Sequence, residues 1–120
     1  MSDRRGLSDY LRDMLDAATS AELFIEGISF EQFHRDRKTV FAVIRALEII
    51  GEAARKVPRP SQAELPLLPW QDMAGMRDKL IHDYMGVNES VVWKTVKEDL
   101  PVLRVHLVRY LRVLEDADET

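Results

Sequence analysis

The residues best suited to chemistry lie in one short stretch, MRDKLIHDY, which covers residues 76–84. On a helical wheel of about 100° per residue, Arg77 falls at the centre of an otherwise apolar stripe. Its neighbours on that stripe are Trp70, Met73, Ala74, Leu80, Ile81 and Tyr84. A guanidinium in the middle of an apolar face departs from the usual helix pattern, so Arg77 marks a candidate site.

Arg77 and His82 together suit cleavage of a phosphodiester without a metal. An imidazole moves protons near neutral pH, and a guanidinium stabilises a charged phosphorane through two donors. Five residues nevertheless place these side chains about 140° apart on a straight helix. They can act on one small substrate only if the helix bends or ends near His82, if the arginine reaches around, or if a two-fold dimer supplies one from each subunit.

A purely structural interpretation stays open beside this one. Arg77 can be a buried cation paired with Glu48 or Glu52, with His82 an ordinary surface residue at a helix end, and the pattern alone favours this interpretation. Tyr84 follows Arg77 by seven residues, about 20° away on the wheel and about 10.5 Å along the axis. Tyr84 can likewise be a helix-end aromatic whose ring packs while its hydroxyl reaches water.

Other well-marked sites are absent from the sequence. The three histidines, His34, His82 and His106, lack the spacing of a metal site, and the chain has no cysteine. No phosphate-binding glycine loop and no serine-hydrolase motif is present. The sequence therefore predicts neither a catalytic metal nor another cofactor.

Length and composition predict a single domain over residues 1–120. The chain contains no apolar run long enough for a membrane span and no signal-like segment, and its lack of cysteine is compatible with a reducing compartment. We expect a soluble, cytoplasmic protein without a membrane partner.

The charge is distributed unevenly. The net charge is −4, which argues against a wide surface that coats nucleic acid. Residues 30–60 nevertheless hold seven cations against four anions. Solvated helix faces are the favoured explanation, and a local RNA-facing patch remains possible.

Apolar periodicity predicts an all-α, up-and-down helical bundle. Three long helices are expected over residues 7–28, from the Asp36 cap to Pro58, and from Asp99 with Pro101 to about Leu114, followed by a frayed acidic tail. The stretch that carries Arg77 lies on a fourth helix that opens at Pro69 and ends at Gly86.

Short elements are expected between these helices. Ser29 has the spacing of a capping box for a short helix with Phe30 and Phe33, and Asn88 caps another that holds Val92 and Trp93. Four prolines between residues 58 and 69 predict a connecting loop.

Residues 68–103, LPWQDMAGMRDKLIHDYMGVNESVVWKTVKEDLPVL, resemble the HepT-type HEPN-domain toxins, which are partners of minimal nucleotidyltransferase (MNT) antitoxins. The resemblance rests on R-x-x-x-x-H-x-Y at Arg77, His82 and Tyr84, on Asp78 directly after the arginine, and on the preceding W..MAG. Upstream, ALEIIGEAARKV (residues 46–57) is also similar to the family, so the likeness runs from about Leu7 to Leu114.

The resemblance implies a homodimeric bundle with a metal-independent ribonuclease site in a cleft at the dimer interface. Carried onto this chain, it makes Arg77 the group that binds the scissile phosphate, His82 a general acid or base, and Asp78 a residue that orients one of them. It also implies a type VII-like toxin–antitoxin system in which the cognate nucleotidyltransferase attaches AMP to Tyr84. The motif shows no departure from the family pattern.

Two classes of function remain from the sequence. The first is a ribonuclease toxin that cleaves tRNA or mRNA and is neutralised by its nucleotidyltransferase. The second is a non-catalytic helical subunit that binds a substrate or serves as a scaffold for the same transferase. The intact motif favours the first.

Overall fold

A computed structural model describes residues 6–82 and 88–119 of the chain, with side chains over 6–76 and 88–117. Every regular element in this part of the chain is a helix. This confirms the predicted all-α class. No helix among these residues is long and apolar enough to cross a membrane.

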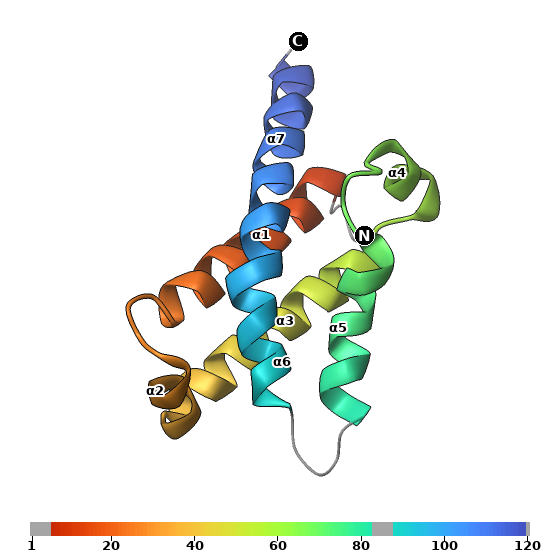
Figure 1. Cartoon of the computed structure of the whole chain (residues 1–120). Helices are drawn as coiled ribbons and strands as arrows, with labels where there is room; N and C mark the ends of the chain where they lie inside the picture. Colours follow the sequence, from red (N-terminus) through yellow and green to blue (C-terminus); the bar gives the residue numbers. More distant parts are fainter. Residues whose placement is uncertain (1–5, 83–87, 120) are drawn as a thin grey trace.

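The described chain forms eight helical segments in the order that Figure 1 shows. Their bounds are α1 (Leu7–Phe24), α2 (Phe30–Arg35), α3 (Arg37–Lys56), α4 (Arg59–Glu64), α5 (Trp70–His82), α6 (Glu89–Lys94), the π-helical turn η1 (Thr95–Asp99) and α7 (Leu100–Glu119).

The long helices alternate in direction, as expected for an up-and-down bundle. Helices α1 and α3 lie against each other and run in opposite directions, while α7 crosses over α1 (Figure 1). Helix α5 packs on α3, and its direction is opposite to that of the α6–α7 rod (Figure 1). Helix α3 is therefore the element on which both α5 and α6 are seated.

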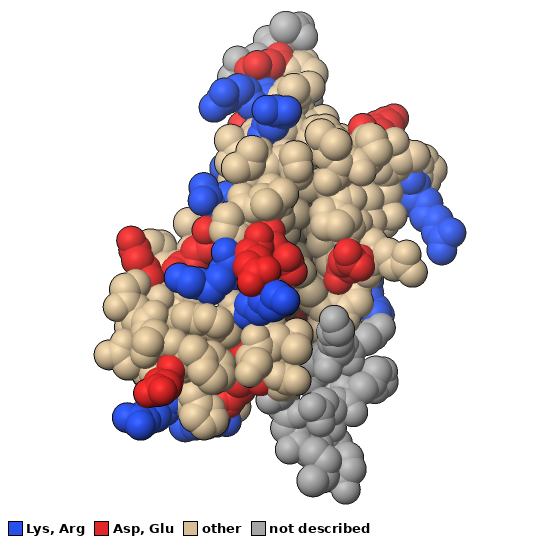
Figure 2. All heavy atoms as spheres, viewed as in Figure 1, with Lys and Arg blue, Asp and Glu red and all other residues tan. Residues whose placement is uncertain are grey.

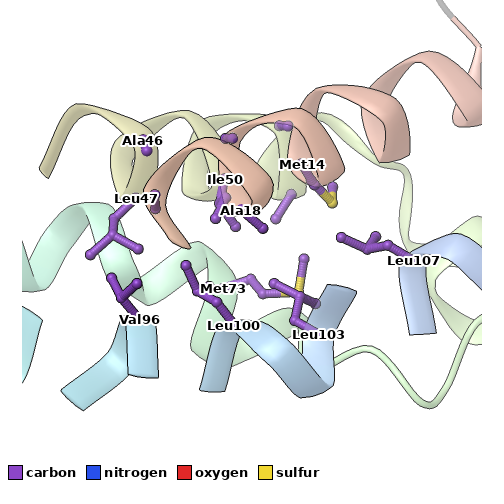
Figure 3. Packing of buried hydrophobic residues seen from close by; sticks show 14 of the residues in the cluster. Met14, Ala18, Ala46, Leu47, Ile50, Met73, Val96, Leu100, Leu103 and Leu107 are labelled. Carbon is purple, nitrogen blue, oxygen red and sulfur yellow. The ribbon is translucent and has the colours of Figure 1, made fainter. Parts of the chain in front are cut away.

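The core is apolar and continuous from α1 to α7. Figure 3 shows Met14, Ile50, Met73, Leu100 and Leu107 converging from four helices into one layer. Each of these side chains is buried, and none of the buried side chains that the structure describes is polar or charged. The apolar positions that recur every three or four residues in α1 and α3 are buried, as the predicted periodicity requires, and in α7 the buried series continues to Leu111.

The corner between α1 and α3 is specified by local hydrogen bonds. Gly27 takes a positive φ of 77°, a conformation that glycine adopts without a steric penalty. Ser29 and Gln32 then form the expected capping box, in which the Ser29 hydroxyl accepts from the Gln32 amide at 3.1 Å and the Gln32 side chain accepts from the Ser29 amide at 2.8 Å. Asp36 caps α3 by accepting from the Thr39 amide and hydroxyl.

Three boundaries differ from the sequence-based expectations. Helix α1 ends at Phe24, before the turn at Gly27, and not near Ile28. The expected loop after Pro58 contains the short helix α4, because Pro60 lies in its first turn, where the missing N–H costs no helical bond. The acidic tail is not frayed, since α7 remains helical to Glu119 and Glu115 pairs with Arg12 of α1.

The last expected helix also begins differently. Helix α6, η1 and α7 follow one another without a break, so Pro101 lies inside a continuous helical rod and does not open a separate helix. A proline cannot donate the usual backbone bond and crowds the carbonyl of the residue four positions earlier. The π turn directly before it, closed by the Leu100 amide donating to Thr95, widens the helix where the proline requires it.

Candidate functional site

The predicted catalytic residues share one helix. Arg77, Asp78 and His82 lie on the second half of α5, where the structure describes the backbone only. Tyr84 lies outside the described residues. The roles of these four residues, and the side-chain geometry that joins them, therefore stay predictions.

The first half of α5 is held by apolar packing and by one side-chain hydrogen bond. The Trp70 indole N–H donates to the carbonyl oxygen of Leu65 at 3.0 Å, which holds the start of the helix against the preceding turn. Met73 is fully buried and Met76 packs against the core. Gln71 and Asp72 are exposed, so the predicted stripe is confirmed over these residues.

The register of α5 has a consequence for the motif. Arg77 comes four residues after the buried Met73, so its backbone position lies one turn further along the face that packs on α3. His82 is the last residue of α5 that the structure describes, and the predicted helix end at Gly86 lies outside the described residues. The conditions under which Arg77 and His82 can share a substrate therefore stay predictions.

The carboxylates proposed as structural partners of Arg77 lie on α3 and have a cation nearby. Arg45 Nη1 lies 3.6 Å from Glu48 Oε1 and 3.4 Å from Glu52 Oε1. These three side chains are partly exposed, so screening by solvent weakens both ion pairs. The side chain of Arg77 lies outside those that the structure describes, so its pairing with Glu48 or Glu52 stays a prediction.

After the motif in the sequence, α6 begins with a cap and a partly buried carboxylate. The Asn88 side chain accepts from the Val91 amide at 3.2 Å, as predicted. Glu89 Oε1 lies 2.8 Å from His34 Nδ1, and Glu89 Oε2 lies 3.0 Å from Arg37 Nη1. The Glu89 side chain is only 14% exposed, whereas His34 and Arg37 are 62% and 60% exposed.

The electrostatics of this corner favour ionised carboxylates. Burial raises the pKa of Glu89, but hydrogen bonds from His34 and Arg37 outweigh that effect and leave the pKa below its usual value. The hydroxyl and backbone amide of Thr39 lower the pKa of Asp36 by donating to its carboxylate. Both groups are therefore negatively charged at neutral pH.

The sequence did not single out Glu89 or its link to His34 and Arg37. His34 was considered only as a metal ligand, and Arg37 only as one of the cations of residues 30–60. The pairs join residues 55 and 52 positions apart, a separation for which no periodicity or local motif gives a signal. The one available signal is that Glu89 directly follows the cap Asn88, within the stretch that resembles the HepT family. That signal does not identify its partners.

The surface charge agrees with the favoured explanation of mixed, solvated faces. In Figure 2 acidic and basic side chains are interleaved over the visible face, without a wide basic area. Two of the cations between residues 30 and 60, Arg37 and Arg45, are paired with carboxylates. Among the residues searched, which are those that the structure describes, no group of three or more potential metal ligands occurs.

Comparison with known proteins identifies the class and then the family. The family model described as Ribonuclease HepT-like matches residues 14–109, a span that includes the whole motif. An all-α bundle that carries this match belongs to the HEPN-type ribonucleases, as the resemblance indicated. The chain belongs to the HepT-like ribonuclease family.

Individual relatives agree with this assignment. The chain is 54% identical over 101 residues to the Probable ribonuclease HepT of Thermococcus cleftensis, covering 84% of this chain and 92% of that protein. It is 34% identical over 116 residues to the Putative RNase MJ1216 of Methanocaldococcus jannaschii, covering 97% and 96%, and 35% identical over 113 residues to the Putative RNase MJ0125 of the same organism, covering 94% and 97%. No solved structure matches the chain.

Proposed function

We propose that this chain cleaves RNA without a metal, at a site formed by Arg77, Asp78 and His82. The observation that carries the proposal is the HepT-like ribonuclease match over residues 14–109, which spans all three residues of an intact motif. Arg77 binds and stabilises the scissile phosphate, His82 acts as general acid or base, and Asp78 orients one of them.

The simplest Arg/His mechanism uses the ribose 2′-hydroxyl of the RNA as nucleophile. Its oxygen attacks phosphorus while its proton passes to an imidazole, and the bond to the 5′-oxygen breaks as that oxygen gains a proton. Arg77 compensates the charge that develops on the phosphorane. The products are a 2′,3′-cyclic phosphate and a 5′-hydroxyl, and the reaction needs no cofactor.

We further propose a symmetric homodimer with the helix that begins at Trp70 at its interface. An arginine on the apolar face of α5 makes most sense where that face meets a second subunit. The dimer would bring Arg77 and His82 of two subunits to one groove. Light scattering at micromolar concentration tests this, and a monomer would contradict it.

The biological role that fits this activity is a toxin of a HEPN/MNT toxin–antitoxin system in the cytoplasm. Its partner is the cognate nucleotidyltransferase, which neutralises it by attaching AMP to Tyr84. The added nucleotide brings a phosphodiester charge that Arg77 is suited to bind. The modified tyrosine would then occupy the site as a tethered mimic of the RNA substrate.

Cleavage of RNA by the purified protein in EDTA tests the ribonuclease proposal directly. The wild type should cleave and the Arg77→Ala variant should not, while Arg112→Ala, which removes an exposed arginine of α7, should cleave normally. A requirement for Mg²⁺ would rule out the mechanism. A folded wild type that cuts no RNA but binds the transferase would instead be the non-catalytic subunit.

A further inference from the structure

We propose that the first half of α3 binds single-stranded RNA, with a base stacked on the Phe41 ring and phosphates held by Arg37, Lys38 and Arg45. These four side chains form the Phe41 patch. The inference rests on the proposed function, because RNA is the ligand on which the proposed ribonuclease acts. The patch is a binding subsite, and none of its residues belongs to the catalytic motif.

The local sequence sets an aromatic ring among cations. The nine residues from Arg37 to Arg45, RKTVFAVIR, contain three cations and no anion. At about 100° per residue, Arg37 lies about 40° to one side of Phe41, while Arg45 and Lys38 lie about 40° and 60° to the other. The buried valines of the same turns lie at least about 100° away from Phe41. Phe41 is therefore at the centre of an outward-facing cationic stripe.

The structure leaves this stripe open to solvent. Phe41 is 63% exposed, more than any other large apolar side chain that the structure describes. The Arg37 and Arg45 side chains are 60% and 59% exposed, and Lys38 is exposed as well. Figure 2 shows basic side chains at the lower left edge of the molecule, where Figure 1 places α2 and the start of α3. The patch is therefore accessible to a ligand as large as an RNA strand.

The contacts of the two arginines leave them able to bind phosphate. The Arg37 guanidinium carbon lies 5.2 Å from the centroid of the Phe41 ring, within the range of a cation–π contact. Arg37 donates to Glu89 through Nη1, and a guanidinium has two further nitrogens that donate. Arg45 is paired with exposed or partly exposed glutamates of α3, and such pairs contribute little, so a phosphate can replace them.

This combination of groups fits RNA better than a protein partner. Proteins that bind single-stranded nucleic acid combine cations along the backbone with aromatic rings on which bases stack. The core of a protein–protein interface is instead depleted of charged residues. A base in a duplex is already stacked and paired, so the ring favours an unpaired strand. The Phe41 patch therefore has the chemistry of a single-strand subsite.

The size of the molecule allows one RNA strand to contact the patch while another part of the same strand is cleaved. The principal-axis extents of the chain are 49 × 29 × 27 Å. About 15 nucleotides at about 3.4 Å each span the longest of them. A subsite that binds substrate and transition state equally well lowers KM and leaves kcat unchanged. Loss of the Phe41 ring should therefore raise KM.

The direct test is the affinity for a fluorescein-labelled, 15-nucleotide single-stranded RNA that carries 2′-O-methyl groups, which block the proposed cleavage. Fluorescence anisotropy should show about 10-fold weaker binding for Phe41→Ala, because a base stacked on an aromatic ring adds this much or more. Phe41→Trp should keep the affinity. The matched control is Val113→Ala, which removes a side chain of α7 that is 61% exposed and should bind as the wild type does.

A second variant tests the cationic part of the patch. Each phosphate contact with a single strand adds about 0.7 to the slope of log affinity against log salt concentration. Lys38→Gln should therefore reduce the magnitude of that slope by about 0.7. Arg112→Gln, at an exposed arginine of α7, should leave the slope unchanged. An unchanged slope in Lys38→Gln would remove this lysine from the subsite.

Three results would overturn the proposal. The first is equal RNA affinity in Phe41→Ala and the wild type. The second is an equal loss of affinity for a duplex of the same sequence, since stacking requires an unpaired base. The third is a change in molecular mass by light scattering in Phe41→Ala with unchanged RNA affinity, which would make the patch a protein interface.

Failure of the proposed function is distinguishable from failure of this inference. If the protein cleaves RNA, Phe41→Ala should raise KM about 10-fold and keep kcat. Cleavage with a KM that does not depend on Phe41 would contradict the subsite and leave the ribonuclease proposal standing. If the wild type cleaves no RNA, the ribonuclease proposal fails, and the anisotropy measurements still test the subsite.

Discussion

Two turns of this molecule are built in opposite ways. The corner between α1 and α3 is held by bonds between residues three positions apart, through Ser29 with Gln32 and Asp36 with Thr39. The first turn of α6 is held instead by Glu89, whose partners are 55 and 52 residues away. The corner between α1 and α3 can therefore form from its own residues, whereas the place of α6 depends on the folded bundle.

This contrast separates the scaffold from the site. Local caps and an apolar core specify α1, α2 and α3. The motif, by contrast, begins on the second half of α5, a helix that itself rests on α3. Substitutions in the motif should therefore change activity with little effect on stability, and substitutions of buried residues in the scaffold should do the reverse.

The largest expected effect is on the chemistry of the motif. His82→Ala should lower RNA cleavage about 10²- to 10⁴-fold, the usual cost of removing a general acid or base. Single-turnover cleavage in EDTA measures the loss. Full activity in His82→Ala would show that catalysis resides elsewhere.

Truncation of the core should give the largest effect on stability. Phe33 is fully buried, so Phe33→Ala should lower the free energy of unfolding by about 3–5 kcal/mol. Phe41 is 63% exposed and the Arg37 guanidinium lies over its ring, so Phe41→Ala should cost less than about 1 kcal/mol. Urea unfolding measures both, and equal losses would contradict the assigned core.

We expect inhibition of ribonuclease activity by the proposed antitoxin to depend on the hydroxyl of Tyr84. Incubation of the protein with the cognate nucleotidyltransferase and ATP should add the mass of AMP to a peptide that contains Tyr84. Tyr84→Phe should abolish both the added mass and the loss of ribonuclease activity. If the transferase neutralises Tyr84→Phe as readily as the wild type, complex formation and not modification controls the toxin.

A substitution in the corner between α1 and α3 should lower stability by a smaller amount. Ser29→Ala removes the hydroxyl that accepts from the Gln32 amide, and loss of such a cap costs about 1 kcal/mol. Ser90 is exposed on α6, one position after Glu89, and the cap of that helix is Asn88, so Ser90→Ala serves as the matched control. Thermal unfolding should separate the two variants while both keep wild-type cleavage rates. A stability for Ser29→Ala equal to that of Ser90→Ala would show that the box contributes nothing.

Lowering the pH should reduce stability gradually, because it protonates both Asp36 at the start of α3 and Glu89 at the start of α6. The pKa values of Glu89 and Asp36 are lowered in the folded protein, so each carboxylate stabilises the fold above its unfolded pKa and loses that contribution as pH falls through its folded pKa. The ordinary values are 4.5 and 3.8, so the loss begins below about pH 4.5. Melting temperature should therefore fall less steeply below that pH in Glu89→Gln than in the wild type.

Most of the fold was predictable because its signals are local. The stripe from Leu11 to Ile25, the caps at Ser29, Asp36 and Asn88, and the stop before Pro58 all follow from spacing within a few residues. The helical tail and the uninterrupted rod through Pro101 were not predictable in this way. They depend on a pair between α1 and α7 and on a widened turn, neither of which leaves a periodic pattern.

For the candidate site, the sequence could indicate which residues take part but not where their side chains lie in the fold. Arg77 and His82 were found because one breaks an apolar stripe and the other matches a spacing. Glu89 was missed because an acidic residue in the first turn of a helix is ordinary, and its role depends on partners from two other helices. Tertiary contacts of this kind become visible only when the bundle is assembled.

The π turn also sets the phase between the two ends of the long helical rod. Buried positions are spaced four apart from Val92 through Val96 to Leu100, which at about 100° per residue would rotate the buried face steadily around an ordinary helix. The wider turn absorbs that rotation. Deleting one residue between Thr95 and Asp99 would remove the extra residue that a π turn carries and close the rod as an ordinary helix. Helix α6 would then keep its rotation relative to α7, but Pro101 would lose the widened turn that accommodates it.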